Sequence, residues 1–211
     1  MSIPFPPMQR PLVAILRGIK PEETAGIVSA LIEAGMTAIE IPLNSPDPFR
    51  SIGIAAKLAP AGVLIGAGTV LSAADVDRLD DAGGKLMVSP NVDVEVLARA
   101  HQHGMATLPG VFSPTEALLA ARVGASSLKF FPASVLGASG ITAIRTVLPP
   151  DVMIAAVGGV SDQNFAEYVR AGIRAFGLGS SLYKPGMTAA DVVVRAGVTI
   201  EAYDRAVLGV G

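Results

Sequence analysis

Eight short apolar runs recur along the chain, separated by longer segments in which apolar residues return every three or four positions. The runs are rich in Ile, Val and Leu and are apolar almost throughout, instead of alternating between apolar and polar residues. This pattern is typical of parallel strands buried on both faces, and the segments between them are typical of amphipathic helices. The predicted strands are residues 12–16, 38–43, 63–67, 86–89, 106–109, 127–131, 152–157 and 175–178.

A glycine precedes most of these runs at nearly regular intervals. Successive spacings are 27, 21, 21, 20 and 48 residues, the last being about two further units. Glycine commonly ends a helix because it adopts the left-handed conformation without steric cost. Each glycine therefore indicates the boundary between one helix and the next strand. The six positions are Gly35, Gly62, Gly83, Gly104, Gly124 and Gly172.

Helix starts are also marked. Ser113, Pro114 and Glu116 form a capping box with proline at the first helical position, and Ser72 and Thr188 are weaker caps of the same kind. Eight strand–helix units in 211 residues predict a single (β/α)8 TIM barrel spanning residues 1–211. An open, doubly wound sheet uses the same alternation and remains the alternative.

The amino-acid composition excludes several classes of protein. Hydrophobic residues make up 51% of the chain and charged residues 16%, so a disordered chain is excluded. The 16 basic and 18 acidic residues are scattered, which argues against nucleic-acid or membrane-surface binding. The chain has no cysteine, no secretory signal pattern and no apolar run of about 18–20 residues. We therefore expect a cytoplasmic protein without disulfides.

One lysine is in an unusual place. Of the five lysines, only Lys129 falls within a predicted apolar strand. Burying an ammonium is costly unless it is paired or its pKa falls, and a neutral amine in an apolar barrel attacks a carbonyl to form a Schiff base. The alternative is a lysine whose tip reaches the rim and pairs with a carboxylate.

Polar residues at the ends of other strands complete a candidate site, because active sites of such barrels lie at the carboxyl ends of the strands. Glu40 is the one carboxylate inside the apolar run 38–43, which suggests an acid–base role or a structural ion pair with Lys129 or Arg17. Arg17 ends the first strand and could clamp a substrate carboxylate or phosphate. Thr69 adds a hydroxyl group to the candidate site, after the third strand.

The loops after strands seven and eight often bind phosphate in this fold. Gly158 and Gly159 follow strand seven, and Gly179 and Ser180 follow strand eight. Glycine turns let backbone N–H groups approach an anion closely. We also expect Ser161 to cap the next helix, adding its dipole.

The sequence predicts no metal site. His101 and His103 lie on the turn into strand five, at the rim opposite the expected site, with no carboxylate or cysteine completing a ligand set. The aspartates of the run 75–81 are expected to form a solvated helix face.

Seven motifs together resemble the 2-keto-3-deoxy-6-phosphogluconate and 4-hydroxy-2-oxoglutarate aldolase family. The resemblance covers about residues 10–205. The motifs are ILRG at 15–18, EIPLNSP at 40–46, GAGTVL at 66–71, SPN at 89–91, LKFFP at 128–132, VGGV at 157–160 and GLGS at 177–180.

This resemblance implies a (β/α)8 barrel, usually a homotrimer, acting as a class I aldolase without metal or other cofactor. It implies that Lys129 is the Schiff-base lysine and Glu40 the general acid–base. Further substrate-binding positions follow from it. Thr69 and Pro90 would line the pyruvate end, Phe131 is a further substrate-binding position, and the turns at Gly158, Gly159, Gly179 and Ser180 would hold the phosphate.

The chain departs from the gluconate-type motif EVTLRT after the second strand. Its arginine is replaced by Asn44, and Arg17 stands at the end of the neighbouring strand. We hypothesise that Arg17 takes over the grip on the keto-acid carboxylate. Within the family, the chain resembles the galactonate-type members most. This resemblance implies cleavage of 2-dehydro-3-deoxy-6-phospho-D-galactonate to pyruvate and D-glyceraldehyde 3-phosphate, with the gluconate epimer and 4-hydroxy-2-oxoglutarate as alternative substrates.

Three other functions fit parts of the pattern. A phosphosugar isomerase or epimerase would use Glu40 as base and Lys129 only as an electrophile. A metal-dependent aldolase would need ligands that the sequence does not offer. A non-catalytic protein would bind the phosphorylated metabolite without releasing pyruvate.

Overall fold

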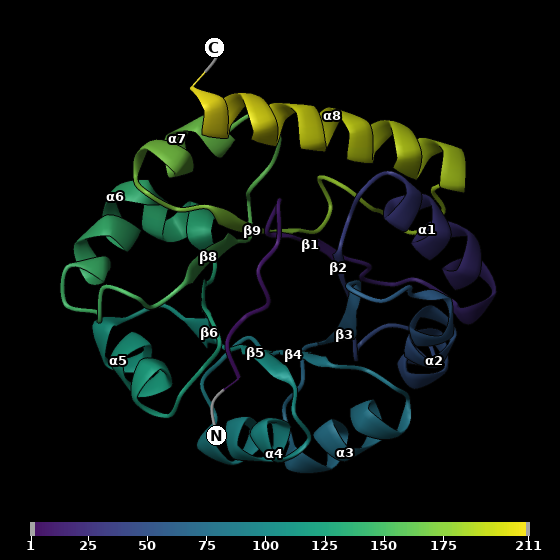
Figure 1. Ribbon diagram of the computed structural model, residues 1–211, viewed down its shortest axis with the longest axis horizontal. Coiled ribbons are helices and arrows are strands. Elements are labelled where there is room, and N and C mark those ends of the chain that lie inside the picture. Colours follow the sequence, from purple (N-terminus) through teal and green to yellow (C-terminus); the bar gives the residue numbers. More distant parts are fainter. Residues whose placement is uncertain (1–2, 210–211) are drawn as a thin grey trace.

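The predicted barrel is confirmed. A computed structural model describes residues 3–209, in which a ring of eight helices surrounds a cylinder of parallel strands (Figure 1). Within that range, no helix is both long and apolar enough to cross a membrane. The strands are β1 Leu12–Ile15, β2 Ala38–Pro42, β3 Leu64–Gly68, β4 Leu86–Val88, β5 Ala106–Leu108, β6 Gly110–Val111, β7 Leu128–Phe130, β8 Ile154–Val157 and β9 Ala175–Leu178. The helices are α1 Pro21–Glu33, α2 Pro48–Leu58, α3 Ala73–Asp81, α4 Val94–Gln102, α5 Pro114–Arg122, α6 Ala133–Arg145, α7 Phe165–Arg170 and α8 Ala189–Leu208.

The predicted fifth strand, 106–109, is seen as the piece β5, Ala106–Leu108, and is followed by a second piece, β6, Gly110–Val111, which the prediction did not include, so nine strands are seen instead of eight. The sheet runs β5-β4-β3-β2-β1-β9-β8-β7-β6, with β5 and β6 at its two ends. Only Pro109 separates these two pieces, and proline has no N–H for the ladder. Its carbonyl still accepts from the Lys129 amide at 2.9 Å. The chain itself therefore closes the barrel.

Local signals placed most helix ends correctly. The six repeated glycines all have positive φ, from +68° to +99°. Ser113 and Thr188 form capping boxes, and the Ser72 hydroxyl accepts from the Asp75 amide. The expected cap at Ser161 is wrong, because α7 begins only at Phe165 after a turn and has Asn164 as its cap.

Strand alternation divides the apolar residues into two cores. Outward side chains such as Ile39 and Ile41 join the large core between strands and helices. Inward side chains form a smaller cluster inside the barrel, comprising Val13, Ala38, Leu86, Val88, Ala106 and Leu108. Phe5 and Met8 of the N-terminal segment pack against this inner cluster, and the segment runs across the ring of strands in Figure 1. The interior is thus filled below the carboxyl ends of the strands, where the cavity lies.

Candidate active site

A cavity of about 420 Å³ opens at the carboxyl ends of the strands. All ten side chains or turns predicted for the site line it: Arg17, Glu40, Thr69, Pro90, Lys129, Phe131, Gly158, Gly159, Gly179 and Ser180. They come from loops and strands far apart in sequence, which the barrel brings to one rim. Ile15, Val157, Val160, Ser161, Gly177, Ser181 and Lys184 complete the lining.

Glu40 faces this cavity because of its position in β2. It lies two residues after inward-facing Ala38, and the intervening Ile39 points to the outer core. Gly68 on β3 leaves the space, since a Cβ there would overlap both carboxylate oxygens of Glu40. Only 3% of Glu40 is exposed, and its Oε2 has no hydrogen-bond partner among the described residues. Burial raises its pKa to about 7, although the positive charges of Lys129 and Arg17 oppose the shift.

Lys129 is the inward residue of β7, between outward-facing Leu128 and Phe130. Its Nζ donates to the Ser89 carbonyl at 3.1 Å and lies 4.7 Å from the centre of the Phe131 ring. The residue is 7% exposed. Burial lowers the pKa of the amine, the Glu40 carboxylate opposes this effect, and Arg17 adds to it. The amine is therefore held close to a carboxyl group in an apolar wall, as a nucleophile requires.

Arg17 extends towards the loop after β2. Its Nη1 donates to Asn44 Oδ1 at 2.8 Å, and Asn44 is the position at which the gluconate-type motif has arginine. The Gly18 amide also donates to Ser45 Oγ at 2.9 Å, which ties the two loops together. The guanidinium thus lies beside the position at which the motif has its arginine, and its grip on the keto-acid carboxylate stays a prediction.

Thr69 has φ +56°, a left-handed conformation that is rare for a β-branched residue. The following amide, of Val70, donates to the Val88 carbonyl at 3.1 Å and fixes the turn. Such strain persists where the surroundings enforce it, and it is common at functional sites.

The two glycine-bearing turns lie side by side on the rim of the cavity, because they follow the paired strands β8 and β9. Gly158 and Gly159 have φ +90° and +78°, and a Cβ at Gly159 would crowd Ser134. Ser181 Oγ donates to the Val160 carbonyl at 3.0 Å, which links the loop after β9 to the loop after β8. Consecutive turns of this kind direct N–H groups towards an anion.

Arg195 on α8 holds the same two loops from outside. Its Nη2 donates to the Ser181 carbonyl at 2.7 Å and to Asp162 Oδ1 at 2.8 Å, and its Nε donates to the Ser181 carbonyl at 3.0 Å. Sequence reasoning missed this residue, as well as the carbonyl of Ser89 and the side chain of Lys184. Capping and strand patterns report on local neighbours, and each of these contacts depends on closure of the barrel.

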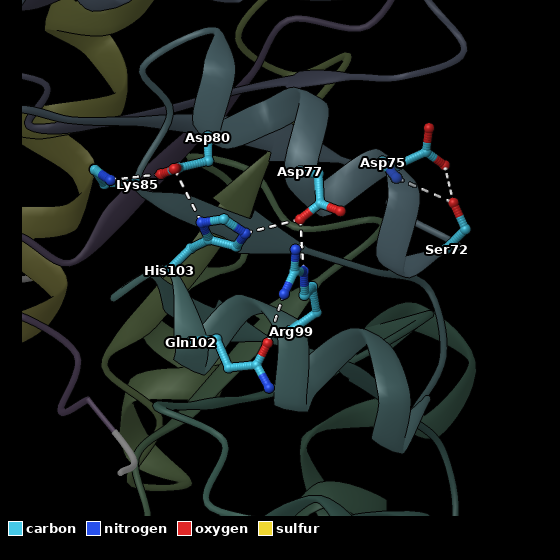
Figure 2. Close-up of polar contacts among 8 residues, drawn as sticks. All are labelled: Ser72, Asp75, Asp77, Asp80, Lys85, Arg99, Gln102 and His103. Atoms are coloured by element: carbon cyan, nitrogen blue, oxygen red, sulfur yellow. Dashed lines mark hydrogen bonds and ion pairs between the residues drawn. The ribbon is translucent and has the colours of Figure 1, made fainter.

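The two histidines lie away from this cavity, as predicted. His103 follows α4 and contacts α3 through both ring nitrogens, Nδ1 at 2.9 Å from Asp80 and Nε2 at 2.8 Å from Asp77 (Figure 2). Arg99 and Lys85 bind the same carboxylates. The expected solvated aspartate face is therefore partly wrong, because two of its members join helices. Within residues 3–209, no group of three or more candidate ligands is arranged to hold a metal ion.

Comparison with known proteins identifies relatives along nearly the whole chain. The chain is 71% identical over 202 residues to a probable 2-dehydro-3-deoxy-6-phosphogalactonate aldolase of Rhizobium meliloti, covering 96% of this chain and 95% of the relative. It is 45% identical over 197 residues to the 2-dehydro-3-deoxy-6-phosphogalactonate aldolase of Escherichia coli, covering 93% and 96% of the two chains.

Solved structures that resemble this chain include aldolases of the same kind as the relatives in sequence. A native KDPGal structure superposes with a TM-score of 0.94 at 43% identity, covering 98% of this chain and all of the other. A KDPG aldolase from Legionella pneumophila, with pyruvate captured as a covalent carbinolamine, has a TM-score of 0.77 at 26% identity and covers 92% of each chain. The model of the KDPG and KHG aldolases matches residues 8–199. With a buried lysine and carboxylate at the barrel rim and these relatives in sequence and structure, the chain belongs to the KDPG and KHG aldolase family.

Proposed function

We propose that this chain is a class I aldolase that cleaves 2-dehydro-3-deoxy-6-phospho-D-galactonate to pyruvate and D-glyceraldehyde 3-phosphate. The observation that carries the proposal is a buried amine, Lys129, electrostatically coupled to a buried carboxyl, Glu40, in a cavity that two glycine-bearing turns also line. The names of the relatives in Rhizobium meliloti and Escherichia coli support the galactonate substrate.

The chemistry starts at Lys129. Its neutral amine attacks C2 of the keto acid to give a carbinolamine, which loses water to become an iminium. The related Legionella enzyme, trapped as a pyruvate carbinolamine, supports this first step. Phe131 and the Ser89 carbonyl position the amine at the start of the reaction.

Glu40 moves the protons. With a pKa near 7, it exchanges a proton at neutral pH in either direction. As a carboxylate, it takes the C4 hydroxyl proton while the C3–C4 bond breaks, and the bonding pair flows to the iminium nitrogen as an enamine. The aldehyde leaves. The carboxylic acid then returns the proton to C3, and water hydrolyses the iminium to release pyruvate and free Lys129.

Trapping tests this assignment. Borohydride reduction in the presence of pyruvate should attach a reduced pyruvyl group to Lys129, read by peptide mass spectrometry. Lys129→Ala should lose both the label and pyruvate release in a lactate dehydrogenase-coupled assay, while Lys57→Ala, on an exposed helix face, keeps both. Label on another lysine, or none, refutes the mechanism. Catalysis without any trapped imine would favour the isomerase or epimerase alternative.

Substrate choice needs a direct comparison. We expect a higher kcat/KM for the galacto epimer than for 2-dehydro-3-deoxy-6-phosphogluconate or 4-hydroxy-2-oxoglutarate. Rates of pyruvate release from the three compounds decide this, and a preference for the gluco epimer would overturn the substrate part of the proposal alone.

Arg17 is assigned to the substrate carboxylate, because its Nη1 donates to Asn44 Oδ1, at the position where the gluconate-type motif has arginine. Arg17→Ala should weaken pyruvate binding, measured as the pyruvate concentration that half-saturates borohydride trapping. Unchanged pyruvate binding with loss of preference for phosphorylated substrate would place Arg17 at the phosphate end instead.

We further propose a homotrimer as the working form. Large apolar side chains are exposed after consecutive strands on the carboxyl rim, at Leu71, Val94, Phe112 and Val135. Neighbouring exposed apolar residues are typical of surfaces that another chain covers. Light scattering should give the mass of three chains, and a monomer mass would refute this.

A further inference from the structure

The phosphate of the proposed substrate carries almost two negative charges at neutral pH. The glycine turns and Ser180 offer N–H and hydroxyl donors but no full positive charge. A positive charge nearby would stabilise a phosphate that is partly removed from water more than neutral donors alone. The cationic side chains that line the cavity or the adjoining pocket are the candidates: Arg17, Lys129, Lys184 and Arg195.

Three of these four cations are already engaged. Arg17 donates to Asn44 at the β2 side. Lys129 is buried, donates to the Ser89 carbonyl and forms the imine in the proposed mechanism. Arg195 is paired with Asp162 and bound to the Ser181 carbonyl, so its charge is neutralised outside the cavity.

Lys184 is the fourth. It lines both the 420 Å³ cavity and the adjoining pocket of about 410 Å³, as do Ser161, Ser180 and Ser181. Its side chain makes no ion pair or hydrogen bond within residues 3–209. Its charge therefore lies beside the glycine turns without a protein partner.

The backbone at Lys184 is firmly held although the side chain is exposed. Leu182 and Tyr183 before it are 1% and 3% exposed. Pro185 after it packs so closely on Gly18 that a Cβ there would lie 2.8 Å from the proline Cγ. The Met187 amide donates to the Lys184 carbonyl at 3.2 Å. A flexible stem on a fixed base suits an ammonium that follows a phosphate into the cavity.

We propose that Lys184 binds the 6-phosphate dianion and sets the preference for phosphorylated over unphosphorylated keto-deoxy sugar acids. This inference rests on the proposed aldolase function. Lys184 acts on binding at the end remote from the breaking bond, so its removal should raise KM and leave the chemistry at Lys129 unchanged.

The test compares Lys184→Gln with the native chain on the phosphorylated sugar acid and on the same acid without phosphate. Loss of one charged contact should lower kcat/KM for the phosphorylated compound roughly tenfold, through KM. The unphosphorylated compound should be cleaved at an unchanged rate. Borohydride trapping of pyruvate, which has no phosphate, should also be unchanged.

Two further variants sharpen the result. Lys184→Arg keeps the charge and should restore most of the preference, while Lys57→Gln removes an exposed lysine elsewhere and should change nothing. Equal losses on both substrates, or none on either, overturn the role of Lys184.

If the native chain releases no pyruvate from either compound, the aldolase proposal fails separately. Calorimetry with inorganic phosphate then decides the Lys184 inference alone. Weaker binding by Lys184→Gln supports it, and equal binding overturns it.

Discussion

Glu40 and Lys129 are each shifted away from their ordinary charge state by the same apolar wall. Burial raises the pKa of the carboxyl to about 7 and lowers that of the amine. Their mutual attraction works against both shifts but does not cancel them. At neutral pH, the carboxyl is therefore poised to give and take a proton, and the amine is closer to neutrality than a surface lysine.

Replacing Glu40 with glutamine tests, at the residue scale, whether this carboxyl transfers the protons of the reaction. Without its proton relay, kcat should fall by about 10²–10⁴-fold, and the native rise of kcat/KM through pH 7 should disappear from the rate profile. Exposed Glu33→Gln, at the end of α1, is the control and should keep the native profile.

The same variant has a signed effect on stability. Because the folded pKa of Glu40 lies above the ordinary 4.5, its stabilising contribution is complete below pH 4.5 and is lost as pH rises towards 7. A glutamine side chain does not titrate, so Glu40→Gln should gain in Tm relative to the native chain as pH rises from the ordinary pKa through about 7. A Tm difference independent of pH in thermal unfolding scans would contradict the assigned shift.

At the scale of elements, Arg195 of α8 binds both loops that carry the glycine turns, from the side facing away from the cavity. Arg195 joins Asp162 after β8 to Ser181 after β9, so two loops that carry the anion-binding turns share one anchor. Ser181 Oγ adds a direct bond between them. The relative position of the turns thus depends on a helix whose residues do not face the reacting atoms.

Arg195→Met should therefore raise KM for the phosphorylated substrate by about tenfold, as expected for lost hydrogen bonds to a charged group. Pyruvate trapping at Lys129 should stay intact. Asp162→Asn should behave similarly, and the double variant should cost less than the sum of the two. Arg205→Met, exposed on the same helix, is the matched control. Additive effects would show that the two residues act separately.

A second prediction at this scale concerns the hydrogen bonds and ion pairs between α3 and α4 (Figure 2). Hydrogen bonds from Arg99 and His103 lower the pKa of Asp77. A lowered carboxyl pKa gives stability that is present above the ordinary pKa of about 4 and is lost as pH falls below it.

Asp77→Asn should accordingly lower Tm at neutral pH, and the difference from the native chain should shrink as pH falls below the ordinary carboxyl pKa of about 4. Asp81→Asn, exposed on the same helix, should have no comparable effect. Aldolase activity of the folded Asp77→Asn variant should be native, because the network lies away from the cavity. A Tm loss that persists at low pH would mean that packing, and not charge, is responsible.

At the scale of the whole molecule, the carboxyl rim carries both the cavity and the exposed apolar side chains Leu71, Val94, Phe112 and Val135. If three chains bury these residues, a charge placed among them should separate the subunits. Phe112→Asp should shift the light-scattering mass from trimer to monomer, while Val207→Asp, exposed on α8, should not. A trimer that survives Phe112→Asp would move the interface elsewhere.

Patterns in the sequence were informative wherever the controlling interaction is local. Apolar runs placed the strands within one or two residues, and glycines and caps placed most helix ends. The interior position of Lys129 singled it out because an ammonium in an apolar strand conflicts with its surroundings. The cap expected at Ser161 failed because a turn of three residues separates it from α7.

Periodicity and short-range hydrogen bonding were thus enough to specify eight alternating strand–helix units and the strand ends that bear the chemistry. The choice of a closed barrel over an open sheet came from the pairing of the strands in the folded molecule. Only the tertiary structure shows which side chains and backbone groups contact one another at the carboxyl ends of the strands. The Ser89 carbonyl reaches Lys129, Asn44 accepts from Arg17, and Lys184 stands beside the glycine turns with no partner among the described residues. These contacts join residues far apart in the chain, and their geometry exists only once the closed cylinder of strands sets their positions.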